Sequence, residues 1–389
     1  MSGPRLPKIR ALTAGVDLDS IDDLRPVERA IGLLARARTR LEREGFEVQL
    51  PRLALPPRLA RLDAPARRAS LAIVRRLDAL AGAAGCVLSV GPVATDDDHA
   101  PGLAGWIAEL TSATSHVFSS VVVASPEGGV HRQSARLAAE AMQAIAAATA
   151  NGLGNFRFAA AAQIPAGTPF FPVAYHHGGP TIAAGLESAH LVHDAVLDAA
   201  HPRDVGRRLI DVLGPALMGV ERVLDGISRD ERVHYLGIDT SPAPLGAASI
   251  GAAIEALANA PFGDAGTLDA CAMVTAAIKT LPVRACGYCG LMLPVLEDDV
   301  LAARAAEDRY GVRDLLLYSS VCGTGLDVVP IPGDTPTAAL ERLLLDVAAL
   351  ATRLDKPLSA RLLLAPGLDA GDTTAFDNPY LVNSRVLAV

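Results

Sequence analysis

The residues between 165 and 180 combine proline, glycine and aromatic side chains with two adjacent histidines. Neutral imidazole transfers protons or binds metals near neutral pH, and loops between rigid elements commonly present such groups. Neighbouring side chains of an extended chain point to opposite sides, so we expect one histidine at most to face a pocket. We predict His176 as a general base or metal ligand and Tyr175 as a substrate contact. A hydrogen-bonded structural histidine is the alternative for His176 and for His177.

Two acidic residues follow apolar segments. Asp239 ends a strand expected at residues 234–239, and the carboxyl end of a buried parallel strand is where α/β folds place ligand groups. We predict Asp239 as an acid or ligand and Ser241 as a substrate contact. Glu187 follows an apolar run and either aims into the same site or lies at the start of a helix. Because His176, Glu187 and Asp239 would also suit a divalent cation, metal-free and metal-assisted chemistry both stay open.

The stretch from Cys322 to Asp327 brings a thiol and a carboxylate close together in the chain. Glycines on both sides of its threonine permit close approach of the backbone to a ligand. We predict Cys322 as a nucleophile or proton donor and Asp327 as an acid or ligand. The substrate contacts expected here are Gly323, Thr324, Gly325 and Asp334. For Asp334, a carboxylate beside the start of the next helix is the alternative.

No cofactor motif is clear. Cys286 and Cys289 have the spacing of zinc and dithiol sites, but no second pair follows and Cys271 is isolated in the sequence. The glycines at 323 and 325 match neither a dinucleotide fingerprint nor a phosphate-binding loop, so no nucleotide cofactor is expected. An odd number of cysteines, five, in a long chain predicts reduced thiols.

Helices and strands are expected to alternate along the chain. The expected strands are residues 8–15, 46–50, 86–90, 116–124, 156–162, 234–239, 283–294, 315–320, 327–331 and 360–364. The expected helices are residues 27–44, 67–84, 103–110, 132–150, 202–224, 249–259, 268–279, 298–309 and 336–354. This alternation favours a mainly parallel sheet with helical crossovers. Because no repeat or linker divides the chain, we expect one α/β domain over residues 1–389.

Composition narrows the classes of partner. A formal net charge of −8 argues against a nucleic-acid partner, because a protein that binds phosphates needs clustered Lys and Arg. No run reaches the roughly 18 apolar residues of a membrane span. The basic residues at the N-terminus precede no apolar stretch, so no signal peptide is expected and a cytoplasmic location is predicted. A small molecule is the expected ligand.

The stretch from Cys322 to Pro336, with the stretch from Cys286 to Asp298 before it, resembles the C-terminal half of domain of unknown function 711, a bacterial and archaeal family. Residues 8–15, 165–176 and 237–244 are similar to other motifs of that family. The resemblance implies a ten-stranded α/β barrel like that of pyruvate formate-lyase and other glycyl radical enzymes, and a homodimer. It does not imply radical chemistry, because residues 378–389 contain no Arg-Val-x-Gly motif and no two cysteines are adjacent.

These observations converge on an enzyme that acts on a small polar, carboxylate-bearing metabolite inside the barrel. Lyase or hydrolase chemistry fits best, since no redox cofactor motif is visible. The alternative is a non-catalytic protein on the same fold that binds or senses a small molecule.

Overall fold

The computed structural model describes residues 6–199 and 201–389. The helices are α1 (Arg25–Arg43), α2 (Ala64–Ala83), α3 (Leu103–Ser112), α4 (Arg132–Ala148), α5 (Ala189–Leu197), α6 (Val205–Glu231), α7 (Ile250–Ala258), α8 (Thr267–Ile278), α9 (Asp299–Ala306), α10 (Val312–Tyr318) and α11 (Thr337–Leu354), with short 3-10 helices η1 (Leu59–Arg61), η2 (Ala150–Arg157) and η3 (Pro202–Asp204). The strands are β1 (Lys8–Gly15), β2 (Val48–Ala54), β3 (Val87–Ala94), β4 (Val117–Ser125), β5 (Gly129–Val130), β6 (Phe158–Ala162), β7 (Thr181–Glu187), β8 (His234–Ala243), β9 (Gly325–Pro332) and β10 (Leu358–Ala365).

The strands form one sheet of mixed direction. Its order is β8-β7-β1-β2-β3-β4-β6-β10-β9, and β5 pairs with β4 at one side. Strands β1, β2, β3, β4 and β6 are parallel, whereas β7 and β10 run antiparallel to their neighbours β1 and β6. Strand β8 is parallel to β7, and β9 is parallel to β10. The end strands β8 and β9 do not pair, so hydrogen bonds between strands leave this sheet of the described residues unclosed.

An irregular segment lies between the two end strands. Ala285 forms a single parallel bridge with Ile238 of β8, and Pro294 forms one with Asp327 of β9. The prediction of a regular strand at residues 283–294 is therefore wrong. The backbone donors in the middle of this segment bond to a buried carboxylate instead of to a neighbouring strand, which prevents a continuous ladder.

Two further differences separate the sequence predictions from the structure. The apolar run predicted as a strand at residues 315–320 belongs to α10, whose first turn is held by the bond from the Gly311 N–H to Asp314 (2.8 Å). Short apolar runs do not distinguish a strand from a buried helix. Strand β7 and helix α5 were not predicted. The other predicted elements overlap observed elements of the same type.

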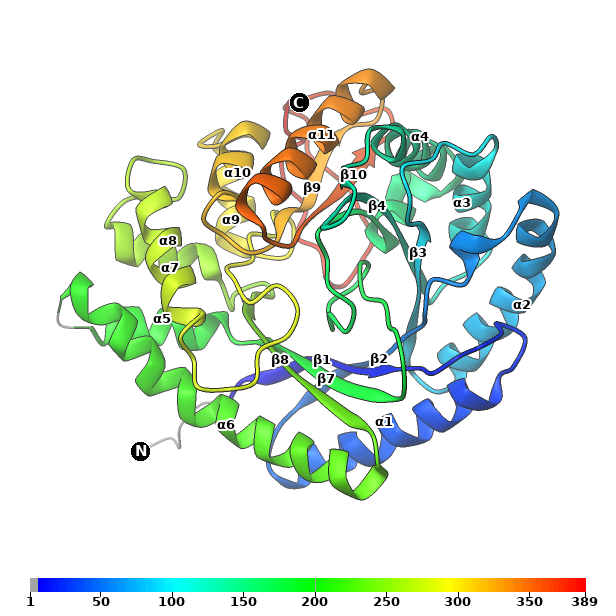
Figure 1. The fold of residues 1–389 in the computed structure, drawn as a ribbon. Helices are drawn as coiled ribbons and strands as arrows, with labels where there is room; N and C mark the ends of the chain where they lie inside the picture. Colours follow the sequence, from blue (N-terminus) through cyan, green and yellow to red (C-terminus); the bar gives the residue numbers. More distant parts are fainter. Residues whose placement is uncertain (1–5, 200) are drawn as a thin grey trace.

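The helices lie on the outer side of the curved sheet, and the segment between β6 and β7 lies on its inner side (Figure 1). We call residues 165–180 the inner loop. The hydroxyl of Thr13 in β1 donates to the carbonyl of Pro169 (2.9 Å), and the hydroxyl of Ser89 in β3 donates to that of Ala174 (2.6 Å). Side chains on the inner face of the sheet therefore hold the loop in place.

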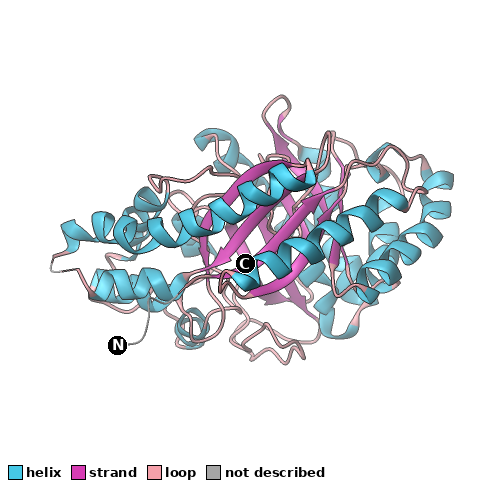
Figure 2. Cartoon of the chain, turned by 90° about the horizontal axis from the view of Figure 1, so that it is seen from below, coloured by secondary structure: helices cyan, strands magenta, loops and turns pink. Residues whose placement is uncertain are grey.

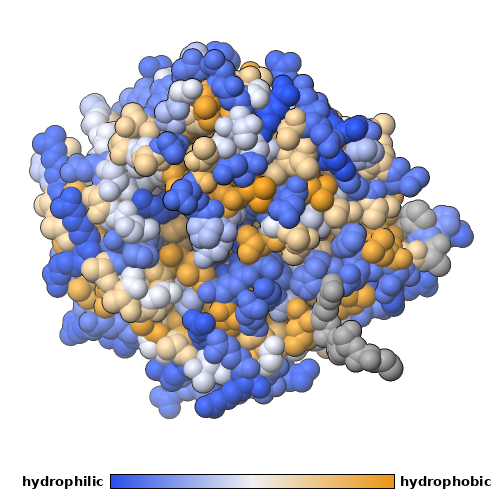
Figure 3. Space-filling model, turned by 180° about the vertical axis from the view of Figure 1, so that it is seen from behind, coloured by the Kyte–Doolittle hydropathy of each residue, from blue (hydrophilic) through white to orange (hydrophobic). Residues whose placement is uncertain are grey.

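Seen from below, long helices cross the outer face of the strands (Figure 2). On the face shown in Figure 3, apolar residues are interspersed among hydrophilic ones. Within residues 6–199 and 201–389, none of the helices combines the length and the apolarity needed to cross a membrane.

Candidate functional site

A cavity of about 580 Å³ lies on the inner side of the sheet, within the size range of small-molecule sites. We call it the central cavity. Phe170 and Phe171 of the inner loop form part of its wall. Its charged lining residues are Arg10, Arg52, Arg157, Arg361, Glu297 and Asp327. Four guanidinium groups face two carboxylates there, so the cavity has an excess of positive charge that suits an anion.

Strand alternation brings these side chains into the cavity. Arg52 and Leu50 are two residues apart on β2, and Arg361 and Ser359 are two residues apart on β10; all four line the cavity. Residues at this spacing lie on the same face of a strand. The sequence therefore inserts an arginine into each of these largely apolar strands at a position that points inward.

Arg361 links the two carboxylates. Its Nε lies 2.8 Å from Oδ1 of Asp327, and its Nη2 lies 3.0 Å from Oε1 of Glu297. Glu297 also accepts a hydrogen bond from Arg10, whose other terminal nitrogen donates to the carbonyl of Pro244 (2.6 Å). This network of four charged side chains is balanced and contains no surplus charge.

The two carboxylates differ in pKa. Burial opposes ionisation of Glu297, but the charges of Arg10, Arg361 and Arg52 outweigh it and lower the pKa of Glu297. Burial raises the pKa of Asp327, and the negative charge of the neighbouring Glu297 raises it further. The positive charge of Arg361 lowers it, but by less than these two effects together. Two acids whose environments move their pKa values apart are typical of acid–base sites. Asp327 is the one more readily protonated.

This network leaves over two cations that line the cavity, Arg157 and Arg52. Arg157 donates hydrogen bonds to the carbonyls of Thr111 (2.6 Å) and Val117 (3.0 Å), so the less well paired of the two is Arg52. Its side chain is 8% exposed, and among the described residues its Nε has no hydrogen-bond partner. Its guanidinium lies 5.2 Å from the ring centre of Phe171 and 6.0 Å from that of Phe170. Burial, and then the charge of Arg10, lower the pKa of Arg52 to about 9, which leaves it a cation at neutral pH. A buried cation without a counterion is costly unless a ligand supplies the negative charge.

Hydroxyl groups form another side of the cavity. The buried Tyr288 donates from its hydroxyl to Oγ of Ser359 (2.9 Å), which in turn donates to the carbonyl of Thr324 (3.2 Å). Within the described chain, Oγ1 of Thr324 is buried and has no partner. A polar group of a ligand would complete this hydrogen bond as well.

Of the predicted site residues, Asp327 and Thr324 line the central cavity. The fully buried Asp239 lies outside it and accepts hydrogen bonds from the N–H groups of Tyr288 (2.8 Å) and Cys289 (3.0 Å). Ser241 donates to Asp239 from both its N–H and its hydroxyl. Burial raises the pKa of Asp239, which these four bonds only partly oppose. Asp239 thus positions the segment that carries Tyr288 into the cavity.

His176 is also placed outside the cavity. It is 2% exposed, and its Nε2 lies 2.8 Å from the carbonyl of Gly179, so the ring holds the end of the inner loop. Glu187 is buried and accepts a hydrogen bond from Gln49, which does line the cavity. Within residues 6–199 and 201–389, no three His, Cys, Asp or Glu side chains gather as a metal-binding group, so His176, Glu187 and Asp239 do not form one.

The remaining predicted residues serve the backbone or lie elsewhere. Cys322 is buried outside the cavity, and its carbonyl accepts a hydrogen bond from Lys356. The backbone at Gly323 packs so closely on that of Gly290 that a Cβ on Gly323 would lie 2.4 Å from its Cα. This glycine permits close packing of the two chain segments and does not line the central cavity, so its role as a substrate contact stays a prediction. The hydroxyl of Tyr175 donates to Ile164.

Two positions near the start and end of β9 complete the predicted set. Gly325 has a φ of +89° and packs against Ser359, where a side chain would not fit. Asp334 is exposed and lies beyond the end of the strand, away from the central cavity. All five cysteines are free.

A protein family matches nearly the whole length of the chain. The family described as "Uncharacterised ACR (DUF711)" matches residues 3–377. The chain belongs to the DUF711 family. It is 33% identical over 394 residues to a UPF0210 protein of Pyrobaculum islandicum, covering 94% of this chain and 84% of the relative. It is 31% identical over 345 residues to one of Pyrobaculum arsenaticum (84% and 76%) and 28% identical over 402 residues to one of Desulforudis audaxviator (95% and 88%).

Sequence reasoning missed most of the charged residues that line the cavity of this DUF711 protein. Arg10, Arg52 and Arg361 each stand inside a largely apolar strand, and in β2 and β10 the arginine is the only charged residue. That pattern is the signal that could have revealed them, because a charge in a buried strand needs a partner or a function. The site residues predicted from the sequence lie mainly at strand ends and in loops, where polar residues are common, whereas these three arginines lie inside strands.

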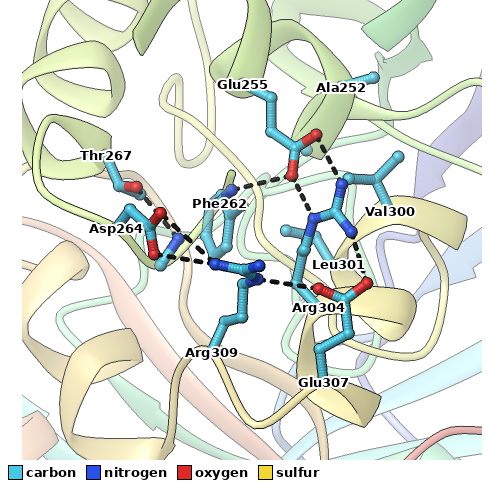
Figure 4. A network of polar contacts seen from close by, with 12 residues as sticks. Ala252, Glu255, Phe262, Asp264, Thr267, Val300, Leu301, Arg304, Glu307 and Arg309 are labelled. Carbon is cyan, nitrogen blue, oxygen red and sulfur yellow. Dashed lines mark hydrogen bonds and ion pairs between the residues drawn. The ribbon is translucent and has the colours of Figure 1, made fainter. Parts of the chain in front are cut away.

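A second charged network, shown in Figure 4, is an ordinary structural cluster and differs from the charges of the central cavity. Arg304 of α9 pairs with Glu255 of α7 (2.5 Å) and with Glu307 (2.6 Å). Arg309 pairs with Glu307 (2.8 Å) and with Asp264 (3.3 Å). Both guanidinium groups have carboxylate partners and remain partly exposed, so this network joins neighbouring segments and offers no free charge to a ligand.

Proposed function

We propose that this protein is an enzyme, a lyase or hydrolase, that acts on a small carboxylate-bearing metabolite in the central cavity. The observation that carries the proposal is the buried, unpaired guanidinium of Arg52 beside a charge-balanced network. A substrate carboxylate would bind Arg52 through two parallel hydrogen bonds, the geometry that guanidinium favours. The apolar part of the substrate would lie against Phe170 and Phe171.

Asp327 is the proposed proton donor or acceptor. Its raised pKa brings its protonation closer to neutral pH, and Arg361 fixes its orientation. Thr324 and Tyr288 supply hydroxyl groups that hold polar atoms of the substrate. In this scheme Asp239 acts through Tyr288 as a positioning residue.

The fold supports the same proposal. Residues 285–294 bridge to β8 at one end and to β9 at the other. We propose that this segment takes the place of a further strand, which would make the fold a barrel similar to that of pyruvate formate-lyase with the central cavity inside. The homodimer and the cytoplasmic location stay predictions.

The test is calorimetric titration of the full chain with a panel of small mono- and dicarboxylates. We expect at least one to bind, and its binding to be lost in Arg52→Met and kept in Arg68→Met, which replaces an exposed arginine of α2. If no carboxylate binds, or if both variants bind equally well, the proposed site is wrong.

A non-catalytic binding protein is the second candidate, because the unpaired Arg52 would serve a sensor equally well. Asp327→Asn separates the two functions. An enzyme would lose turnover of the bound carboxylate and keep binding it, whereas a sensor would show no turnover in either form.

A further inference from the structure

A second cavity, of about 660 Å³, lies further along the same strands. The central cavity contacts Val87 and Phe118 near the amino ends of β3 and β4, whereas the second cavity contacts Pro92 and Ala124 near their carboxyl ends. The inner loop lines both cavities. Ligands of parallel sheets commonly bind at the carboxyl ends of the strands, which is where the second cavity lies.

The charge of this second cavity is opposite to that of the central cavity. Its lining, which lies within the described residues, contains the carboxylates of Asp96, Asp97 and Glu127 and no Lys or Arg. Asp97 is used by the protein itself, because it accepts the N–H groups of Gln133 (2.6 Å) and Ser134 (3.2 Å) at the start of α4. Asp96 and Glu127 are exposed and stand at the mouth.

Polar atoms inside the second cavity lack partners. Ser120 is fully buried and lies two residues from Val122 on β4, so the two side chains share the inner face of the strand, and both line the cavity. Its Oγ has no hydrogen-bond partner among the described residues. The same holds for Nδ1 of His131, which is 4% exposed and whose Nε2 lies 3.0 Å from Oγ of Ser125. A ligand that reached the floor of the cavity would complete these bonds.

We propose that the second cavity binds a small organic cation, with its ammonium group near Asp96 and Glu127 and a polar group at its far end bonded to Ser120. The ring of Tyr175, whose centre lies 5.3 Å from that of His177, provides aromatic surface that attracts a cation. A metal ion fits less well, because the described residues contain no metal-binding group of side chains. The site does not depend on the function proposed for the central cavity.

The charge requirement is tested by NMR saturation transfer and titration of the full chain with tyramine, which has an ammonium at one end and a phenol at the other. We expect 4-ethylphenol, which lacks the ammonium, to bind more weakly. The double variant Asp96→Asn with Glu127→Gln should weaken tyramine binding by about five-fold. Glu109→Gln, an exposed carboxylate of α3, is the control and should change nothing. Equal binding of the two probes, or equal affinity in the double variant and the control, would overturn the proposal.

The floor of the site is tested with Ser120→Ala. The variant should weaken tyramine about two- to ten-fold and leave phenethylammonium, which has no hydroxyl, unchanged. Ser119→Ala is the matched control, since Ser119 is equally buried on β4 but lies outside the cavity. Because the comparison is between two probes on one variant, a general loss of folding would weaken both probes alike. That result, or no effect on either probe, would exclude Ser120 as a ligand contact.

Discussion

Arg361 and Asp327 form an ion pair between neighbouring strands of the sheet, with 2.8 Å between Nε and Oδ1. The side chains are only 8% and 15% exposed, and the same guanidinium bonds to Glu297. The pair therefore does two things at once. It compensates buried charge in the apolar surroundings of the sheet, and it orients the carboxylate proposed to exchange protons with a substrate.

Replacement of Arg361 by leucine should destabilise the protein strongly. Two buried carboxylates would lose a shared counterion, which typically costs about 3–5 kcal/mol. Urea denaturation measures the change in the free energy of unfolding. Arg36→Leu, which breaks a surface pair with Glu231, is the control and should cost no more than about 1 kcal/mol. Similar losses in the two variants would mean that the internal network is not the source of stability.

Replacement of Arg52 by methionine should stabilise the ligand-free protein. The variant removes a buried guanidinium whose Nε has no acceptor within the described part of the chain, and the desolvation of such a group costs about 1–3 kcal/mol. Residues that are kept for function often leave the protein less stable than it could be. Urea denaturation measures the expected gain in the free energy of unfolding. The control variant Arg68→Met should stay within about 0.5 kcal/mol of the unmodified chain. A less stable Arg52→Met protein would indicate a structural role for Arg52.

Anion binding in the central cavity should strengthen as the pH falls. The pKa of Asp327 is raised, so Asp327 is protonated before Glu297, whose pKa is lowered. Protonation removes a negative charge beside the site, and a bound anion would in turn favour that protonation. Benzenesulfonate is a suitable probe because it stays ionised throughout, and calorimetry at pH 4 to 8 measures its affinity. The Asp327→Asn variant should bind it more tightly at neutral pH and lose this pH dependence; an unchanged dependence would assign the titration to another group.

A methyl group at residue 323 should not be tolerated. The Cβ of Gly323→Ala would meet the backbone of Gly290 at 2.4 Å, so one of the two segments must move, at a cost of about 1–3 kcal/mol or more. Thermal unfolding compares this variant with Gly179→Ala, where a Cβ meets nothing within 4 Å. If both alanine variants melt alike, the segment from 287 to 290 is more adaptable than its packing indicates.

Much of the local structure followed from residue patterns. Strand β1 was predicted with its observed limits, because an apolar run ended at a polar turn. The two errors in element type fell at residues 283–294 and 315–320. At 283–294 tertiary hydrogen bonds to Asp239 decided the conformation, whereas at 315–320 a short apolar run fitted a strand and a helix equally well. Asp239 and His176 were singled out as chemically capable residues, and in the structure most of their hydrogen bonds are to backbone groups.

The sequence by itself determined the family, the alternation of helices and strands, and the presence of Asp327 and Thr324 among chemically capable residues. Only the tertiary structure showed which side chains share a cavity. Arg10 and Arg52 come from the first two strands, Arg361 comes from the last strand, and Glu297 comes from the segment before α9. Their meeting depends on sheet order and on which face of each strand points inward. Neither property is local, because both are decided by long-range pairing, and so the unpaired charge of Arg52 becomes visible only after the chain has folded.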